Sequence, residues 1–142
     1  MGEHVLVPFD GSPQSEAALD HAIESHPNAT ITALTVIDPI DAGYGGRASF
    51  PSFSQEWFER AEEAAEELLA EAVERGDDLN RAVETDTVVG RPSRAIVEYA
   101  DEAGVDAIVM GSHGRDGVAR ILLGSVAETV VRRSSVPVTV VR

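Results

Sequence analysis

The segment from Val105 to Ser125 decides the fold of this chain, and it reads VDAIVMGSHGRDGVARILLGS. Its first six residues, Val105–Met110, are mostly apolar and partly β-branched, which is typical of a buried strand. Glycines then recur up to Gly124, and apolar residues at helical spacing follow Ser125. This order predicts a strand, a glycine-rich connection and a helix that ends near Arg133.

The rest of the chain repeats this alternation of strands and helices. Apolar runs with strand character occupy residues 5–9, 30–37, 81–89 and 136–141. Helical spacing begins at Pro13, at Ser54 and at Pro92. Such alternation indicates an α/β fold with an open, mostly parallel sheet and helices on both of its faces. Because no linker is long enough to divide the chain, we expect a single domain over residues 1–142. The order of the strands does not follow from this pattern alone.

The helix that Ser54 opens has the clearest pattern. Gly76 suits the cap at its C-terminal end. The spacing of four residues predicts ion pairs between Glu56 and Arg60 and between Glu71 and Arg75 on its wet side. Its apolar stripe is expected in the core and consists of Trp57, Ala61, Ala65, Leu68 and Ala72.

The composition excludes several chemistries. The chain has 142 residues, 25 acidic and 11 basic, and a net charge of −14; every basic residue is an arginine, and there is no cysteine. Without lysine the chain has no Schiff base and no phosphate loop of the usual lysine-dependent kind. Without cysteine it has no thiolate catalysis, disulfide or zinc–thiolate site. The acidity disfavours nucleic acids and anionic membranes as partners.

The acidity has two interpretations, a solvated surface or adaptation to high salt. The complete loss of lysine favours a halophilic protein, because high ionic strength screens the repulsion between carboxylates. The N-terminus has no basic region before its first apolar run, and no apolar stretch approaches about 20 residues. We therefore expect a cytoplasmic protein without a membrane span.

Ligands of open parallel sheets bind outside the carboxyl ends of the strands. That rule selects residues 8–10, 36–38 and 110–111. The last place opens the frame G-x2-G-x9-G-S, in which Gly111 and Gly114 permit a positive φ and close approach of a ligand. Gly124 and Ser125 stand where a helix begins, and its free N–H groups and dipole favour an anion such as a phosphate. The alternative is a glycine-rich connection that only turns the chain.

These motifs resemble the universal stress protein family over essentially the whole chain. The resemblance rests on IVMGSHG at 108–114, LLGSVAE at 122–128, VPV at 136–138 and VPFDGS at 7–12. It implies a Rossmann-like sheet of five parallel strands in the order 3-2-1-4-5. The glycine frame is similar to that of the ATP-binding branch, so the resemblance implies an ATP-binding, nucleotide-dependent regulator of the stress response.

The resemblance also implies which residues hold the nucleotide. Those near the adenine and ribose would be Pro8, Asp10, Val36, Met110 and Gly111, and those at the phosphates Gly114, Gly124, Ser125 and Val126. His113 and Arg115 join this set from the connection between them. Relatives often carry lysine there, whereas this chain has only Arg115 and Arg120. We therefore expect the phosphates to rely on backbone amides, the arginines and Mg²⁺ or Mn²⁺.

Several residues keep a second interpretation. Asp10 could simply cap the turn after its strand. His113 could be an exposed loop histidine, and Asp38 and Asp41 could belong to a polar loop rather than to a metal site. His4, His21 and His26 lack the spacing of metal ligands and are expected at the surface.

Two other functions stay open. Slow ATP hydrolysis would use Asp10 or His113 to orient water, but the sequence shows no pair of nucleophile and base. The other is a dimeric interaction module without nucleotide. In the family order the last strand lies at a sheet edge, and its apolar run Val136–Val141 predicts a homodimer through that edge.

Overall fold

The computed structural model describes residues 2–39, 55–112 and 123–142. Its strands are β1 (His4–Pro8), β2 (Thr30–Ile37), β3 (Val83–Val89), β4 (Ala107–Gly111) and β5 (Val138–Val141). Its helices are α1 (Pro13–Ser25), α2 (Gln55–Asp78), α3 (Pro92–Ala103) and α4 (Ser125–Arg133). Within this part of the chain, no helix is both long enough and apolar enough to cross a membrane.

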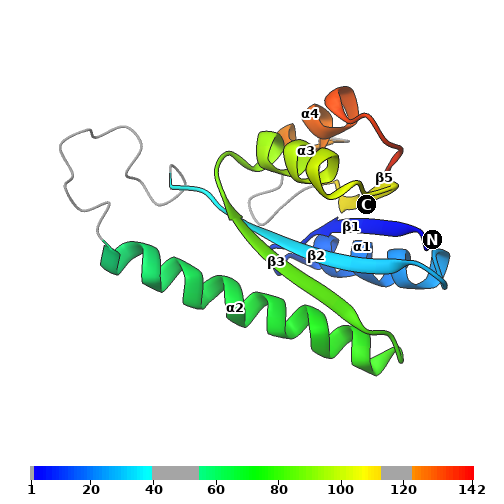
Figure 1. Ribbon diagram of the computed structural model, residues 1–142, viewed down its shortest axis with the longest axis horizontal. Coiled ribbons are helices and arrows are strands. Elements are labelled where there is room, and N and C mark those ends of the chain that lie inside the picture. Colours follow the sequence, from blue (N-terminus) through cyan, green and yellow to red (C-terminus); the bar gives the residue numbers. More distant parts are fainter. Residues whose placement is uncertain (1, 40–54, 113–122) are drawn as a thin grey trace.

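The five strands form one parallel sheet in the order β3-β2-β1-β4-β5. Figure 1 shows α1 and α2 on one side of this sheet and α3 and α4 on the other. The expected fold class, the Rossmann-like layering and the strand order 3-2-1-4-5 are all confirmed.

Two apolar cores lie on the two faces of the sheet, because successive strand residues point to opposite sides. Val5, Val7 and Ile31 belong to the core beneath α1 and α2. The core beneath α3 and α4 contains Leu6 and Ile108. The buried apolar residues that α2 contributes are Ala65, Leu69 and Ala72, so Leu69 takes the central place that the sequence pattern assigned to Leu68.

The end of α2 also differs from the prediction. The helix runs to Asp78, and Gly76 lies buried inside its last turn rather than capping it. A Cβ atom at position 76 would lie 2.5 Å from Val83 Cγ2 and 2.7 Å from the carbonyl oxygen of Arg81. The turn itself is made by Asn80, whose φ is 60°. Gly76 is therefore required by the return of the chain into β3.

Arg75 pairs with α1 rather than with its own helix. Its guanidinium donates to both carboxylate oxygens of Asp20, at 2.7 and 3.0 Å, and lies 3.9 Å from Glu16. The hydrogen bond to Asp20 is the main cause that raises the pKa of Arg75. The predicted ion pair of Arg75 with Glu71 is wrong, because Asp20 of α1 binds the guanidinium through both of its carboxylate oxygens. The predicted ion pair of Glu56 with Arg60 is confirmed at 3.1 Å.

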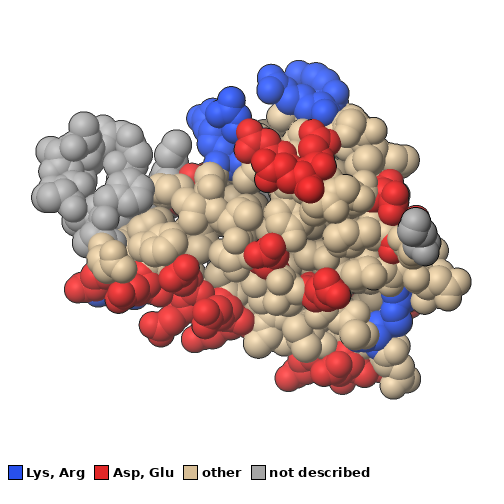
Figure 2. Space-filling model, in the orientation of Figure 1, with Lys and Arg blue, Asp and Glu red and all other residues tan. Residues whose placement is uncertain are grey.

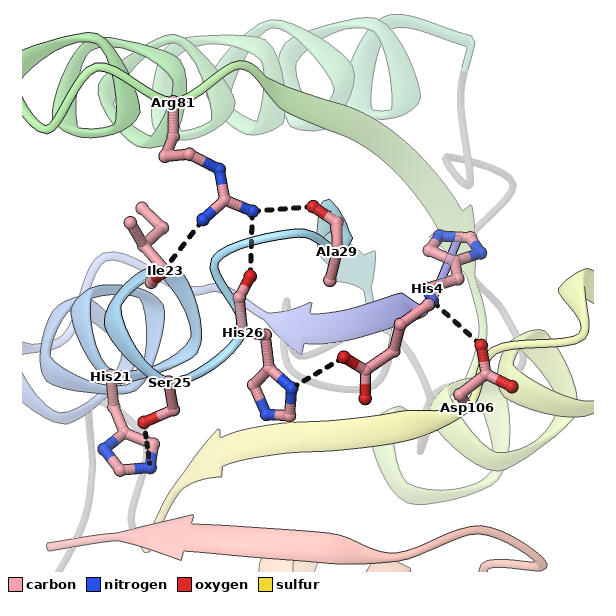
Figure 3. A network of polar contacts seen from close by, with 9 residues as sticks. His4, His21, Ile23, Ser25, His26, Ala29, Arg81 and Asp106 are labelled. Carbon is pink, nitrogen blue, oxygen red and sulfur yellow. Dashed lines mark hydrogen bonds and ion pairs between the residues drawn. The ribbon is translucent and has the colours of Figure 1, made fainter. Parts of the chain in front are cut away.

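At the amino end of the sheet, a network of polar contacts joins the turns before the strands (Figure 3). The Arg81 guanidinium donates to the carbonyl oxygens of Ile23 at 2.9 Å, His26 at 3.0 Å and Ala29 at 2.6 Å. These carbonyls stand at and just beyond the C-terminal end of α1, where the helix itself provides no partner. One arginine thus ties the turn before β2 to the turn before β3.

The three histidines near this end make local contacts. His21 is exposed and bonds Ser25, whereas His26 is half-buried and lies 3.0 Å from a Glu3 oxygen. The ring of His4 is half-buried and lies 2.8 Å from the buried Thr32 hydroxyl, so this histidine is less exposed than the sequence predicted.

Candidate functional site

A crevice is expected where two neighbouring strands lead to helices on opposite sides of the sheet. Here those strands are β1 and β4. Their pairing covers only Val5 with Ala107 and Leu6 with Ile108, although β1 continues to Pro8 and β4 to Gly111. The carboxyl ends of β1 and β4 therefore form the topological switch point at which open α/β sheets bind ligands.

Three of the predicted site residues share one face of the sheet at this end. Pro8, Val36 and Met110 stand two residues beyond Leu6, Leu34 and Ile108, which belong to the core beneath α3 and α4. Met110 is buried, whereas Pro8 and Val36 are half-buried. The fold thus brings together three apolar side chains from strands that are distant in sequence.

Helix α4 begins directly beside this face. The N–H of Gly124, its N-cap residue, donates to the carbonyl oxygen of Ser112 at 2.7 Å and so ties the helix to the end of β4. The N-cap residue Gly124 has no side chain with which to cap α4, Ser125 is exposed, and Val126 is half-buried. Among the described residues the first N–H groups of α4 therefore have no side-chain cap from their own N-cap residue, and together with the helix dipole they suit an anion.

The backbone at Gly124 does not require a glycine. Its φ of −72° and ψ of 168° are extended values that any residue adopts. Serine, threonine, aspartate and asparagine are the preferred residues at this position of a helix. The absence of a side chain at position 124 is thus unexplained by the local conformation.

Helix α1 begins differently at the same edge. The Ser12 hydroxyl accepts from the Ser15 N–H at 3.1 Å, and the Ser15 hydroxyl donates to the Ser12 carbonyl at 2.9 Å. Asp10 accepts from the Ser12 N–H at 2.9 Å. The turn-capping interpretation of Asp10 is therefore confirmed, and its carboxylate lies at the carboxyl end of β1.

Gly111 owes its identity to packing. A Cβ atom there would lie 2.7 Å from Gln14 Cβ and 2.9 Å from the Gln14 carbonyl carbon, in the first turn of α1. Among the described glycines, the positive φ values belong to Gly11, Gly90 and Gly104, so Gly111 does not use the positive φ that a glycine permits. His113, Gly114, Arg115 and Arg120 lie outside the described residues, as does Asp41.

A second hollow lies on the other side of the sheet, between the end of β2 and the first turns of α2. This groove of about 230 Å³ is lined by Thr35, Val36, Ile37, Asp38, Trp57, Ala61, Ala64, Ala65 and Leu68. Sequence reasoning missed the groove because it assigned Trp57 and Leu68 to the core, whereas both are half-buried at its wall. The signal in the sequence was the small side chains of Ala61, Ala64 and Ala65, spaced along the helix after the tryptophan.

Metal ligands are not gathered in the described part of the chain. Residues 2–39, 55–112 and 123–142 contain no group of three or more His, Asp or Glu side chains that could hold a metal ion. Asp38 lines the groove beside β2 rather than joining such a group.

The sequence of this chain is similar to those of known proteins. The model of the universal stress protein family matches residues 1–142. A universal stress protein of Methanocaldococcus jannaschii is 36% identical over 141 residues, covering 97% of this chain and 81% of that protein. A second one from the same organism is 34% identical over 155 residues, covering 100% of this chain and 96% of the relative.

Solved structures agree with the strand order and layers. The structure of the second Methanocaldococcus jannaschii protein has a TM-score of 0.83 and 33% identity, and the match covers 99% of this chain and 96% of that one. A universal stress protein in complex with cAMP has a TM-score of 0.67 and 30% identity, with 99% and 96% covered.

Proposed function

This chain belongs to the universal stress protein family, and we propose that it binds ATP or a closely related adenine nucleotide and acts as a nucleotide-dependent regulator of a stress response. The observation that carries the proposal is the N-terminus of α4, whose N-cap residue provides no side-chain cap and which the hydrogen bond from Gly124 to Ser112 ties to the end of β4. The similar protein in complex with cAMP supports an adenine nucleotide as the class of ligand.

In this proposal the two halves of the nucleotide meet two different surfaces. The apolar face near β1, β2 and β4 receives the base and ribose through Pro8, Asp10, Val36, Met110 and Gly111. The start of α4 receives the phosphates through Gly124, Ser125 and Val126, with His113, Gly114 and Arg115 contributing from the glycine-rich connection. A flat base suits apolar side chains, and phosphate oxygens suit backbone N–H groups.

The net charge of −14 opposes an incoming phosphate tail. Glu128 stands in the first turn of α4, but its carboxylate pairs with Arg132 at 2.9 Å, which offsets its charge. A divalent ion carried on the phosphates would offset more of the repulsion. We therefore expect nucleotide binding to require Mg²⁺ or Mn²⁺ and, if the acidity reflects life in brine, to persist in molar salt.

Calorimetry with ATP tests the proposal directly. The titration is made with Mg²⁺, with Mn²⁺ and with a chelator, at low and at molar salt, and circular dichroism verifies the fold in each buffer. Heat that depends on the metal supports the proposal. A folded protein that gives no heat with any adenine nucleotide would contradict it. Mass spectrometry of the denatured protein identifies a nucleotide that co-purifies, and a phosphate-release assay measures hydrolysis.

We further propose that two copies pair through β5. This edge strand carries no charged side chain from Val138 to Val141, and three of its four residues are half-buried in the isolated chain. Such an edge exposes backbone groups and apolar side chains that a second copy would cover. Sedimentation that detects only species of 15.1 kDa at every concentration would rule this pairing out.

A further inference from the structure

The outer edge of β3 is the opposite edge of the sheet, and its backbone directions can be assigned. β3 pairs with β2 on one side, and among the described residues no strand pairs with it on the other. The Gly90 N–H donates to the Ile37 carbonyl at 2.9 Å, toward β2. Because the direction alternates along a strand, the N–H groups of Thr85, Thr87 and Val89 point outward.

One of these outward groups already has a partner. The Thr87 N–H donates to Oδ1 of Asp86 at 2.8 Å, and the Tyr99 hydroxyl of α3 donates to Oδ2 of the same carboxylate at 2.8 Å. Burial and the hydrogen bond to Asp86 raise the pKa of Tyr99 to about 12, so the phenol stays a donor at neutral pH. Tyr99 thus holds the Asp86 carboxylate over the edge.

The face of this edge toward α2 forms a groove of about 490 Å³. Its lining consists of Glu62, Glu66, Leu69, Ala70, Val73, Thr85, Asp86 and Thr87. The leucine, alanine and valine would attract an apolar strand, whereas the carboxylates of Glu62 and Glu66 would repel an acidic chain. Figure 2 shows acidic side chains spread over the region that α2 and β3 occupy in Figure 1.

We propose that Asp86, held by Tyr99, closes the β3 edge to strand addition by a second copy and so restricts assembly of this protein to the β5 edge. A strand that added to β3 would have to take the Thr87 N–H away from the carboxylate. It would also leave Asp86 desolvated between the guest strand and α3, which is costly for a charge without a charged partner. The proposal concerns assembly and does not depend on nucleotide binding.

The geometry of the two edges explains why such a device is useful. Pairing of β5 with β5 is symmetric and closes after two copies. Pairing of the apolar β5 of one copy with β3 of the next is head-to-tail, and it leaves a free edge at each end. Repetition of that contact would give an open filament.

The test compares Asp86→Val with Glu102→Val, which removes the same charge from an exposed position of α3. Sedimentation velocity and light scattering follow both full-length variants over a range of concentration and salt. We expect Asp86→Val to form species several times the wild-type mass that grow with concentration and salt, while Glu102→Val stays at the wild-type mass. Equal growth of both variants would show that lost charge alone drives association, which overturns the proposal.

A second substitution identifies the partner edge. Thr139→Glu places a charge on the exposed position of β5, so its combination with Asp86→Val should stop the growth. Growth that continues in this double variant would overturn the head-to-tail contact. If circular dichroism shows that Asp86→Val does not fold, Tyr99→Phe replaces it, because this change frees the carboxylate and keeps the ring. Wild-type mass of Tyr99→Phe at every salt concentration would then overturn the proposal.

Discussion

Helices α1 and α4 begin at the same edge of the sheet, after neighbouring strands, but only α1 caps its own N-terminus. Ser12 and Ser15 bond one another at the start of α1. At the start of α4 a glycine with an ordinary φ stands where a capping side chain would be preferred. Helix α3 also lacks a side-chain cap, but it follows the edge strand β3, away from the crevice between β1 and β4. The side chains of α1 thus account for its own start, whereas the start of α4 lacks such a cap from its N-cap residue and is the one that we propose to hold a ligand.

The strongest way to break this comparison is to give α4 a cap of its own. In Gly124→Asp the new carboxylate would accept hydrogen bonds from the N–H groups that we assign to the phosphates. Its negative charge would also repel the phosphates. We expect calorimetry to show nucleotide affinity at least about 100-fold weaker, roughly 2.8 kcal/mol. Stability against urea should stay the same or rise by a few tenths of a kcal/mol, because aspartate is a preferred N-cap.

Gly124→Val tests space rather than charge at the same position. A β-branched side chain should fill the phosphate cradle and abolish binding without unfolding the protein. Wild-type affinity in both variants would mean that the start of α4 does not hold the phosphates.

The second prediction concerns Gly111, which packs against the first turn of α1, the helix that caps its own N-terminus. Gly111→Ala would place a Cβ atom 2.7 Å from Gln14 Cβ and force α1 to shift. We expect a loss of about 1–3 kcal/mol in the free energy of unfolding, measured with urea. Gly104→Ala is the control, because its φ of 68° is strained for alanine although nothing lies within 4 Å. An unchanged free energy of unfolding in Gly111→Ala would show that α1 shifts without cost and would contradict this prediction.

A third pair of variants sharpens the contrast between the two serines. Ser12→Ala removes the cap of α1 and should cost about 1 kcal/mol of stability, with nucleotide affinity near that of the wild type. Ser125→Ala removes an exposed hydroxyl at the start of α4 and should weaken nucleotide binding instead. Thermal unfolding measures the stability of both variants, and calorimetry measures their affinity for the nucleotide. The same loss in the same quantity for both variants would erase the distinction.

The smallest expected effect is the alkaline loss of the Tyr99 contact. An unfolded tyrosine titrates near pH 10, whereas in the folded protein the pKa of Tyr99 is raised to about 12. The stability that Tyr99 contributes is thus fully present below about pH 10 and is lost as the pH rises through 12. Urea unfolding between pH 9 and about 12 should show this decline in the wild type and less of it in Tyr99→Phe. Parallel curves would contradict the shift.

The sequence predicted the elements well because their signals are local. The starts of α1 at Pro13, of α3 at Pro92 and of α4 at Ser125 agree with the structure. The strand order came from the family resemblance instead. Strands that pair can be far apart in the sequence, and the periodicity of one strand does not reveal which other strand it pairs with. Pro8, Val36 and Met110 do lie at the carboxyl ends of their strands, whereas their part in ligand binding stays a prediction.

The wrong predictions share a cause. In the sequence, Gly76 looks like a helix cap, but it is a glycine because another segment of the chain passes within 3 Å of the missing Cβ, as also happens at Gly111. Arg75 likewise pairs with Asp20 on α1 and not with Glu71 on its own helix. Contacts between distant segments decide these residues, and spacing along one segment does not reveal them.

The place of Trp57 has an optical consequence. It is the only tryptophan of the chain, and it stands in the first turn of α2 at the wall of the groove beside the end of β2. Fluorescence excited at the red edge of protein absorption therefore comes from a single indole at one known location. A molecule that enters this groove, or a movement of α2 against β2, would change that emission without any attached dye.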